Sequence, residues 1–241
     1  TRLDFDRTKF HTFLEPVYET VKRLRSALGD DKTLIGFAGA PWTVATYMVE
    51  GGSSKDFKYT KSFAYGDPDG FQMLMDLLVD ATAEYLIKQA DAGAQTLQIF
   101  DSWSGVLPEA AFQRWVMAPT ARLVQLIRAA HPDIPIIGFP KGAGHYLLPY
   151  AEQTGITALA FDQTVPLSYV RDRLQTQLPV QGALDNGLLL TGGAPMLKAA
   201  EELIETLGGR PFIFNLGHGV IKETPPEHVA ELSAFIKQAR V

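Results

Sequence analysis

Apolar side chains recur at two spacings along this chain, and the alternation of the two predicts its architecture. Between residues 7 and 28 they return every three or four positions, which predicts an amphipathic helix. The same spacing predicts long helices at residues 68–92 and 108–130, and shorter ones at about 143–154, 166–178, 194–208 and 225–239. Glycine follows several of these segments, as it commonly does at helix C-termini: Gly93, Gly155 and Gly208.

Short apolar runs separate the helices and predict buried strands. They lie at residues 34–38, 96–100, 134–139, 158–161, 180–184 and 212–216, and glycine, aspartate or proline follows each. Buried strands that alternate with helices predict a parallel sheet. Two architectures fit: a doubly wound sheet, or a (β/α)8 barrel, which needs eight strands where six are counted. No linker or repeat divides the chain, so we expect a single domain over residues 1–241.

Composition narrows the classes of function. The 241 residues are 46% hydrophobic and 20% charged, which is typical of a globular domain with a sizeable core. The net charge of -5 does not favour nucleic acid, and no apolar run reaches the length of a membrane-spanning helix. The absence of cysteine excludes disulfides, thiolate metal sites and a cysteine nucleophile. No cluster of His, Asp and Glu has the spacing of metal ligands.

Polar residues gather where the predicted strands end, at the edge where ligands bind in both architectures. They are Asp101, Ser102, Lys141, Asp162, Asp185 and His218. Asp and Ser are also common helix N-caps, so a purely structural role is an equal alternative for them. His218 stands between two glycines that let the backbone approach a ligand, and Lys141 is a candidate contact for an anion. These residues predict an α/β enzyme that binds a small molecule without a metal.

Several segments at this rim resemble the uroporphyrinogen decarboxylases. They are LIGFAGAPWT at residues 34–43 with TYMVEGG at 46–52, QIFDSWSG at 98–105, and FNLGHG at 214–219 with TPPEHV at 224–229. GALD at 182–185 is similar to the family's Gly-Asn-Leu-Asp, from which Ala183 departs. The segments follow the family's order and spacing across the whole chain.

The resemblance implies an α/β fold of the (β/α)8 TIM barrel type, in a cytoplasmic homodimer. It also implies conversion of the four acetate arms of uroporphyrinogen III to methyl groups, which yields coproporphyrinogen III with no cofactor and no metal. Tyr47, Ser102 and His218 match family positions that contact the substrate's carboxylate arms or stabilise the reacting ring. Phe37 and Phe100 match apolar residues that pack against the pyrroles, although they equally suit a core. No nucleic acid or membrane is expected as a partner.

One departure from the family concerns its opening motifs. Arg-Gln-Ala-Gly-Arg and Phe-Ser-Asp lie on the family's first two barrel strands, and neither occurs here. The family's aspartate is thought to stabilise a cationic pyrrole, and its arginines bind carboxylates. We therefore expect about six of eight strands, a missing N-terminal part, and no catalytic residue within this chain. The fragment alone is expected to be inactive.

Two other functions are alternatives to a decarboxylase. A methyltransferase of the same barrel superfamily would use a zinc site with His and Cys ligands, which a chain without cysteine cannot build. A binding module that has lost its catalytic strands is the second alternative. Tyr47, Ser102 and His218 would have little reason to persist together in such a module, which favours the enzyme.

Overall fold

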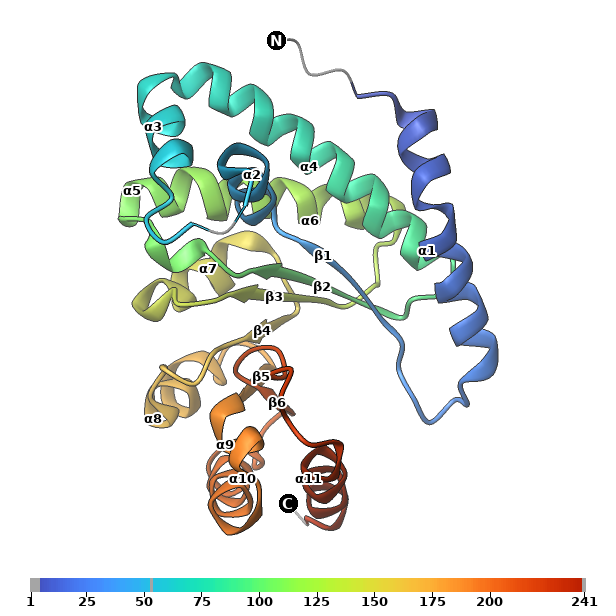
Figure 1. Ribbon diagram of the computed structural model, residues 1–241, viewed down its shortest axis with the longest axis vertical. Coiled ribbons are helices and arrows are strands. Elements are labelled where there is room, and N and C mark those ends of the chain that lie inside the picture. The colour runs from blue at the N-terminus through green and yellow to red at the C-terminus, as the bar shows by residue number, and fades with distance from the viewer. Residues whose placement is uncertain (1–4, 53, 240–241) are drawn as a thin grey trace.

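A parallel sheet of six strands forms the centre of the computed structural model, which describes residues 5–52 and 54–239 (Figure 1). The strands are β1 (Ile35–Gly39), β2 (Thr96–Asp101), β3 (Ile136–Pro140), β4 (Ala158–Ala160), β5 (Val180–Leu184) and β6 (Phe212–Leu216). Each strand pairs with the next one in the chain, so the sheet order is β1-β2-β3-β4-β5-β6. A doubly wound sheet reverses its order at a switch point. The sequential order therefore excludes that alternative and agrees with barrel-type winding.

The sheet is not closed within the described residues. β1 pairs only with β2, and β6 only with β5, so each has one free edge. Burial follows this arrangement: β3 and β5 are buried along their whole length, whereas β6 alternates between half-buried and exposed residues. Six consecutive strands of a barrel would have this pattern, with the exposed positions at the free edge.

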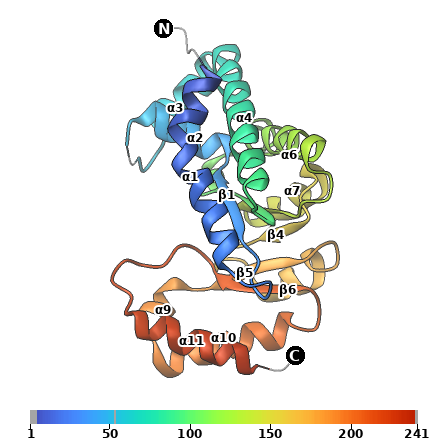
Figure 2. The same ribbon diagram turned by 90° about the vertical axis from the view of Figure 1, so that its right-hand side faces the viewer.

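Helices connect the strands and pack on one face of the sheet, as Figures 1 and 2 show. They are α1 (Arg7–Ala27), α2 (Pro41–Glu50), α3 (Lys58–Gly66), α4 (Pro68–Asp91), α5 (Glu109–Phe112), α6 (Ala118–Ala130), α7 (Leu147–Thr154), α8 (Leu167–Tyr169), α9 (Asn186–Thr191), α10 (Gly193–Leu207) and α11 (Pro226–Gln238). The large hydrophobic core lies between these helices and the sheet, with Trp42, Phe71 and Trp115 almost fully buried. No helix in the described ranges is long and apolar enough to cross a membrane.

The predicted strands are confirmed, each to within two residues at either end, but three helices were missed. One of them, α2, begins at Pro41, with only Ala40 between it and β1. Proline suits that position, since its missing N–H would have no intrahelical partner there and its φ is already helical. The short helices α3 and α9 were not predicted either.

The long helix predicted at residues 108–130 is present but interrupted. A wide turn of π type, Gln113–Met117, separates α5 from α6. Pro119 cannot donate an N–H to the carbonyl of Trp115, four residues before it, and this lost hydrogen bond accounts for the wider turn. The ring of Trp115 packs edge-on against Phe71 of α4, with centroids 4.8 Å apart, so the interrupted helix is held to its neighbour by core contacts.

Candidate functional site

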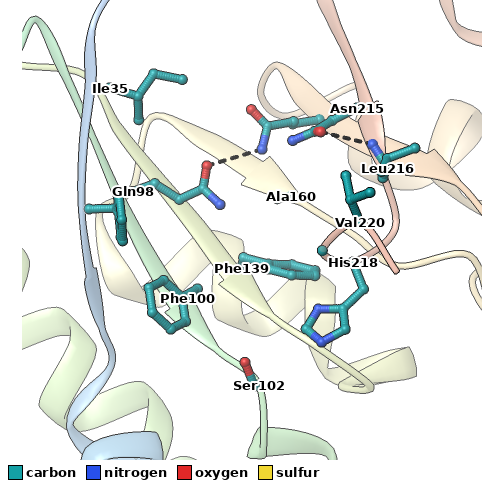
Figure 3. Close-up of a pocket in the computed structure, with 13 residues that line it drawn as sticks. Ile35, Gln98, Phe100, Ser102, Phe139, Ala160, Asn215, Leu216, His218 and Val220 are labelled. Carbon is teal, nitrogen blue, oxygen red and sulfur yellow. Dashed lines mark hydrogen bonds between the residues drawn. The ribbon is translucent and has the colours of Figure 1, made fainter. Parts of the chain in front are cut away.

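A cavity of about 500 Å³ lies on the sheet face opposite the helices (Figure 3). Its wall is mainly apolar, with Phe37 from β1, Phe100 from β2 and Phe139 from β3. Alternate residues of a strand point to the same face, and the register pairs Phe100 with Phe139, so these rings line one surface. Phe37 remains 58% exposed. A ligand in the cavity would therefore cover an aromatic surface that is otherwise open to water.

Ser102 and His218 lie at one end of this cavity, and Ile35 lies at the other (Figure 3). Ser102 directly follows β2, and His218 comes two residues after β6. Both are thus at the carboxyl ends of parallel strands, where the active sites of barrel enzymes lie. Strands that are distant in the chain bring these two polar side chains to the same apolar cavity.

Three amide side chains line the cavity between those ends: Gln98, Gln181 and Asn215. The Gln181 side-chain N–H donates to Gln98 Oε1 at 3.2 Å, and Asn215 Oδ1 accepts from the backbone N–H of Leu216 at 2.8 Å. Sequence reasoning did not select any of the three. The sequence signal that could have found them is a polar residue at an inward position of an otherwise apolar strand. A buried strand tolerates such a residue only when its polar groups form hydrogen bonds.

The loop that carries Ser102 is held against the loop after β3. The Ser104 hydroxyl lies 3.0 Å from the carbonyl oxygens of both Asp101 and Lys141, and Gly105 N–H donates to the Lys141 carbonyl at 3.1 Å. A Cβ on Gly105 would lie 2.5 Å from the carbonyl oxygen of Gly142, so only glycine permits this approach. Ser102 therefore sits on a well-anchored backbone.

Charged groups surround His218 at the mouth of the cavity. Partial shielding of the His218 ring from water lowers its pKa, and the nearby Lys141 charge lowers it further, while Asp162 acts in the opposite direction. At neutral pH the imidazole is therefore neutral, with one ring N–H that can donate a hydrogen bond. The Asp162 carboxylate accepts from the backbone N–H groups of Gly142 at 2.7 Å and Thr164 at 2.9 Å, which joins the loops after β3 and β4.

The cavity itself carries little charge. Among the described residues that line it, His218 is the only one with an ionisable side chain other than a hydroxyl. No group of three or more His, Cys, Asp or Glu in the described ranges is arranged to hold a metal ion. None of the salt bridges found in residues 5–52 and 54–239 involves Lys141, so its ammonium is available to an anion near His218.

Comparison with known proteins identifies the family. The model of the family "Uroporphyrinogen decarboxylase (URO-D)" matches residues 2–239. The uroporphyrinogen decarboxylase of Rhodospirillum rubrum is 50% identical over 232 residues, which are 96% of this chain and 67% of the relative. That of Chelativorans sp. is 50% identical over 236 residues, 98% of this chain and 69% of the relative. The chain belongs to the uroporphyrinogen decarboxylase family. It spans about two thirds of the length of these relatives.

Solved structures agree with this decarboxylase family on the fold. A methyltransferase from Methanosarcina mazei superposes with a TM-score of 0.77 at 20% identity, covering 92% of this chain and 63% of that one. Such low identity shows a shared fold and nothing of the reaction. The predicted membership of the uroporphyrinogen decarboxylases, which are carboxy-lyases of porphyrin biosynthesis with a TIM-barrel fold, is confirmed by the family match and the relatives.

The structure of this decarboxylase-family chain brings together two of the three predicted substrate-binding residues. Ser102 and His218 share the cavity, whereas Tyr47 lies on α2, outside the residues that line it. Tyr47 is 50% exposed, and its ring stands edge-on to Trp103 with centroids 6.4 Å apart. Phe37 belongs to the cavity wall rather than the core. The roles of these side chains toward a substrate stay predictions.

The three strand-end aspartates of the chain have different environments. Asp185 caps α9, since its carboxylate accepts the Gly187 N–H at 2.8 Å. Asp162 joins two loops, as described above. Asp101 is 1% exposed and faces the helices rather than the cavity, so it fits neither the simple cap nor the ligand contact that its position in the sequence suggested.

Proposed function

We propose that this chain forms the pocket that binds uroporphyrinogen III for removal of the carboxylates of its four acetate arms, which gives coproporphyrinogen III. The observation that carries the proposal is the cavity, with an aromatic wall and a polar end, in a member of this family. A tetrapyrrole is an apolar macrocycle with anionic arms, so it needs both features. Burial of aromatic wall such as Phe37 would supply affinity, and directed polar groups would orient the arms.

The polar groups have distinct proposed roles. His218, neutral at pH 7, donates one N–H to an arm carboxylate, and the Ser102 hydroxyl donates a second hydrogen bond. Lys141 adds a positive charge next to His218, as its effect on the His218 pKa indicates. Tyr47 approaches from α2, outside the cavity lining, and reaches only an arm that extends beyond the wall. Hydrogen bonds to a charged group typically contribute about 1.5–3 kcal/mol each.

The decarboxylation itself needs an electron sink. Protonation of the pyrrole at the ring carbon next to the one that bears the arm gives a cation that is conjugated with the arm. The bond to the carboxylate carbon then breaks, and its electron pair forms an exocyclic double bond that neutralises the ring. Carbon dioxide leaves, a second proton adds to the exocyclic carbon to complete the methyl group, and the ring carbon releases the proton that it had gained, which restores the pyrrole. An anionic group beside the pyrrole N–H groups would stabilise the cation. No carboxylate lines the cavity among the described residues. We therefore propose that residues 1–241 bind the tetrapyrrole without turning it over.

Binding and turnover should be measured separately. Uroporphyrin III, the oxidised form of the substrate, is titrated into the 241-residue protein while its fluorescence is followed. Phe37→Ala should weaken binding, whereas the matched control Phe13→Ala, on an 84% exposed side chain of α1, should not. Equal affinity of both variants and the unsubstituted protein would remove the cavity from the proposal.

Turnover is assayed as coproporphyrinogen III formed from uroporphyrinogen III. The 241 residues alone should give none above a buffer control. The same residues joined to the segment of the Rhodospirillum rubrum enzyme that they do not cover should give activity. Turnover by the 241 residues alone, at the rate of the joined protein, would show that the essential groups lie within this chain.

The assembly and location of the protein are further parts of this proposal. Resemblance to the family supports a cytoplasmic homodimer. Sedimentation equilibrium of the joined protein should give twice the mass of one chain, and a monomer at micromolar concentration would contradict the dimer.

A further inference from the structure

The last residue of β2, Asp101, carries a carboxyl group that is buried on the helix-covered face of the sheet. Its Oδ1 accepts a hydrogen bond from the Thr43 hydroxyl at 2.5 Å, and its Oδ2 has no hydrogen-bond partner among the described residues. A carboxylate that is buried without its full set of hydrogen bonds destabilises the folded protein, by roughly several kcal/mol. An apolar residue would fill the same space without that penalty, so folding alone does not explain the carboxyl group.

The Thr43–Asp101 contact joins two elements that carry site residues. Thr43 lies in the first turn of α2, and Tyr47 follows one turn later on the same helix. The Thr43 hydroxyl also accepts the backbone N–H of Trp103 at 3.3 Å, and the Trp42 indole N–H donates to the Trp103 carbonyl at 3.0 Å. Ser102 lies between Asp101 and Trp103. The orientation of α2 relative to Ser102 therefore depends on this set of bonds.

The N-terminus of α2 also favours a carboxylate at the position of Asp101. The N-cap residue of α2 is Ala40, which has no side chain that could accept the free N–H groups of the first turn. The backbone N–H of Thr43 instead acts on Asp101 and favours its charged form, as does the N–H of Trp103. A negative charge at a helix N-terminus is also favoured by the helix dipole. Asp101 thus brings a carboxyl group from another strand to the first turn of α2, where it is bonded to the Thr43 hydroxyl.

We propose that Asp101 is a positioning residue: through Thr43 it holds α2 and the loop after β2 in one arrangement, so that Tyr47 and Ser102 act on the same ligand. This role rests on the proposed function, and Asp101 itself contacts no ligand. This role differs from a general stabilising role. Burial in the core disfavours the charged form of Asp101, yet the charged form is the one that binds α2 more strongly.

Protonation of Asp101 should therefore loosen the arrangement. Burial raises the pKa of Asp101 to about 7, while hydrogen bonds from Thr43 and the Trp103 N–H act in the opposite direction. Tyr150 of α7 faces the same carboxyl, and its pKa is raised, first by burial and then by the Asp101 charge, so it stays neutral throughout. Above pH 7 the carboxylate binds α2 strongly, and as the pH falls below 7 the protonated form binds it less. Protonation of His218 at lower pH would instead strengthen anion binding, so the two effects have opposite signs.

The first test needs no ligand. The indole N–H resonance of Trp42, which reports the bond to the Trp103 carbonyl, is followed by NMR between pH 5.5 and 8.5 in the 241-residue protein and in Asp101→Asn. We expect a midpoint near pH 7 that is absent from the variant. A control, Asp185→Asn, replaces an exposed cap that lies outside this set of bonds and should titrate like the unsubstituted protein. A resonance without a titration, or with the same titration in Asp101→Asn, overturns the proposal.

The second test measures uroporphyrin III affinity over the same range of pH. Asp101→Asn should weaken binding about 10-fold at pH 8, which corresponds to the loss of one hydrogen bond to a charged group, and should remove the fall in affinity below pH 7. Thr43→Val should behave in the same way at pH 8, whereas Thr43→Ser, which keeps the hydroxyl, should restore binding. Lower thermal stability with unchanged affinity and pH profile would show a merely structural role and overturn the proposal. If the Trp42 resonance titrates as expected but the unsubstituted protein binds no uroporphyrin, the proposed function fails rather than the positioning.

Discussion

The loops after β2 and β6 both place a polar side chain at the same end of the cavity, but they are held very differently. In the loop after β2, Ser104, Gly105 and Trp103 are all bonded to neighbouring segments, and Asp101 before them is buried. In the loop after β6, Gly217 N–H donates to the Leu184 carbonyl, while His218 and the two residues after it are exposed.

This difference follows from the position of each strand. β2 is paired on both sides and covered by helices, so its loop ends in a packed environment, whereas β6 has a free edge. Local stability depends on such packing and bonding, and it is lower where few contacts exist. Ser102 is therefore held by more contacts than His218, whose side chain is exposed.

The largest effect on stability should come from disrupting the contacts that hold the loop after β2. Trp42→Ala removes a fully buried side chain and its bond to the Trp103 carbonyl, and we expect the free energy of unfolding to fall by about 3–5 kcal/mol. Urea denaturation followed by circular dichroism would measure it. Phe13→Ala, on the surface of α1, should change the value by less than about 0.5 kcal/mol. A loss below about 1 kcal/mol for Trp42→Ala would mean that the loop after β2 is less firmly packed than its contacts indicate.

The second effect is the dependence of stability on pH that Asp101 creates. Its ordinary pKa is 3.8 and burial raises it to about 7, so between these values the folded protein binds more protons than the unfolded chain. Stability therefore falls as the pH rises from about 4 to 7 and does not change further above that, by at most ~4 kcal/mol for a three-unit shift. Asp101→Asn should remove this slope from a series of urea unfolding curves. The same slope in the variant would assign the titration to another group.

A smaller effect on stability is expected in the loop after β6. A Cβ on Gly217 would lie 2.6 Å from the backbone nitrogen of Gln163, so Gly217→Ala should destabilise the protein by about 1–3 kcal/mol. Gly219→Ala meets no atom within 4 Å and serves as the matched control. Thermal unfolding of the two variants would compare them. Equal stability would show that the loop after β6 moves freely enough to absorb the clash.

The smallest change in stability should come from His218→Ala, which should instead lower the affinity for the ligand. The exposed side chain contributes less than about 0.5 kcal/mol to folding, but its loss should weaken uroporphyrin III binding by about 1–3 kcal/mol. Calorimetric titration and thermal unfolding on the same samples would separate the two quantities. Unchanged affinity would remove His218 from the site and leave the loop after β6 without a role in binding.

The amino-acid sequence alone determined the six strands, the longer helices, the parallel sheet and the end of the sheet where a site would lie. The spacing of apolar residues is a local property of the sequence. It favours a helix or a buried strand in each segment, wherever that segment packs in the fold. Ser102 and His218 could be selected for the same reason, because each directly follows a strand or nearly so. The family motifs added membership of the uroporphyrinogen decarboxylases, which the family match and the relatives confirm.

The tertiary structure alone decided how those elements meet. Asp101 and Thr43 are 58 residues apart in the chain, and no local pattern predicts that their side chains form a hydrogen bond. The same holds for Gln98 and Gln181, which pair across the cavity, and for Tyr47, which lies outside the cavity lining because α2 begins at Pro41. Burial, pKa and ligand access depend on such distant contacts, since they are set by what surrounds a side chain in space rather than by what precedes it in the chain.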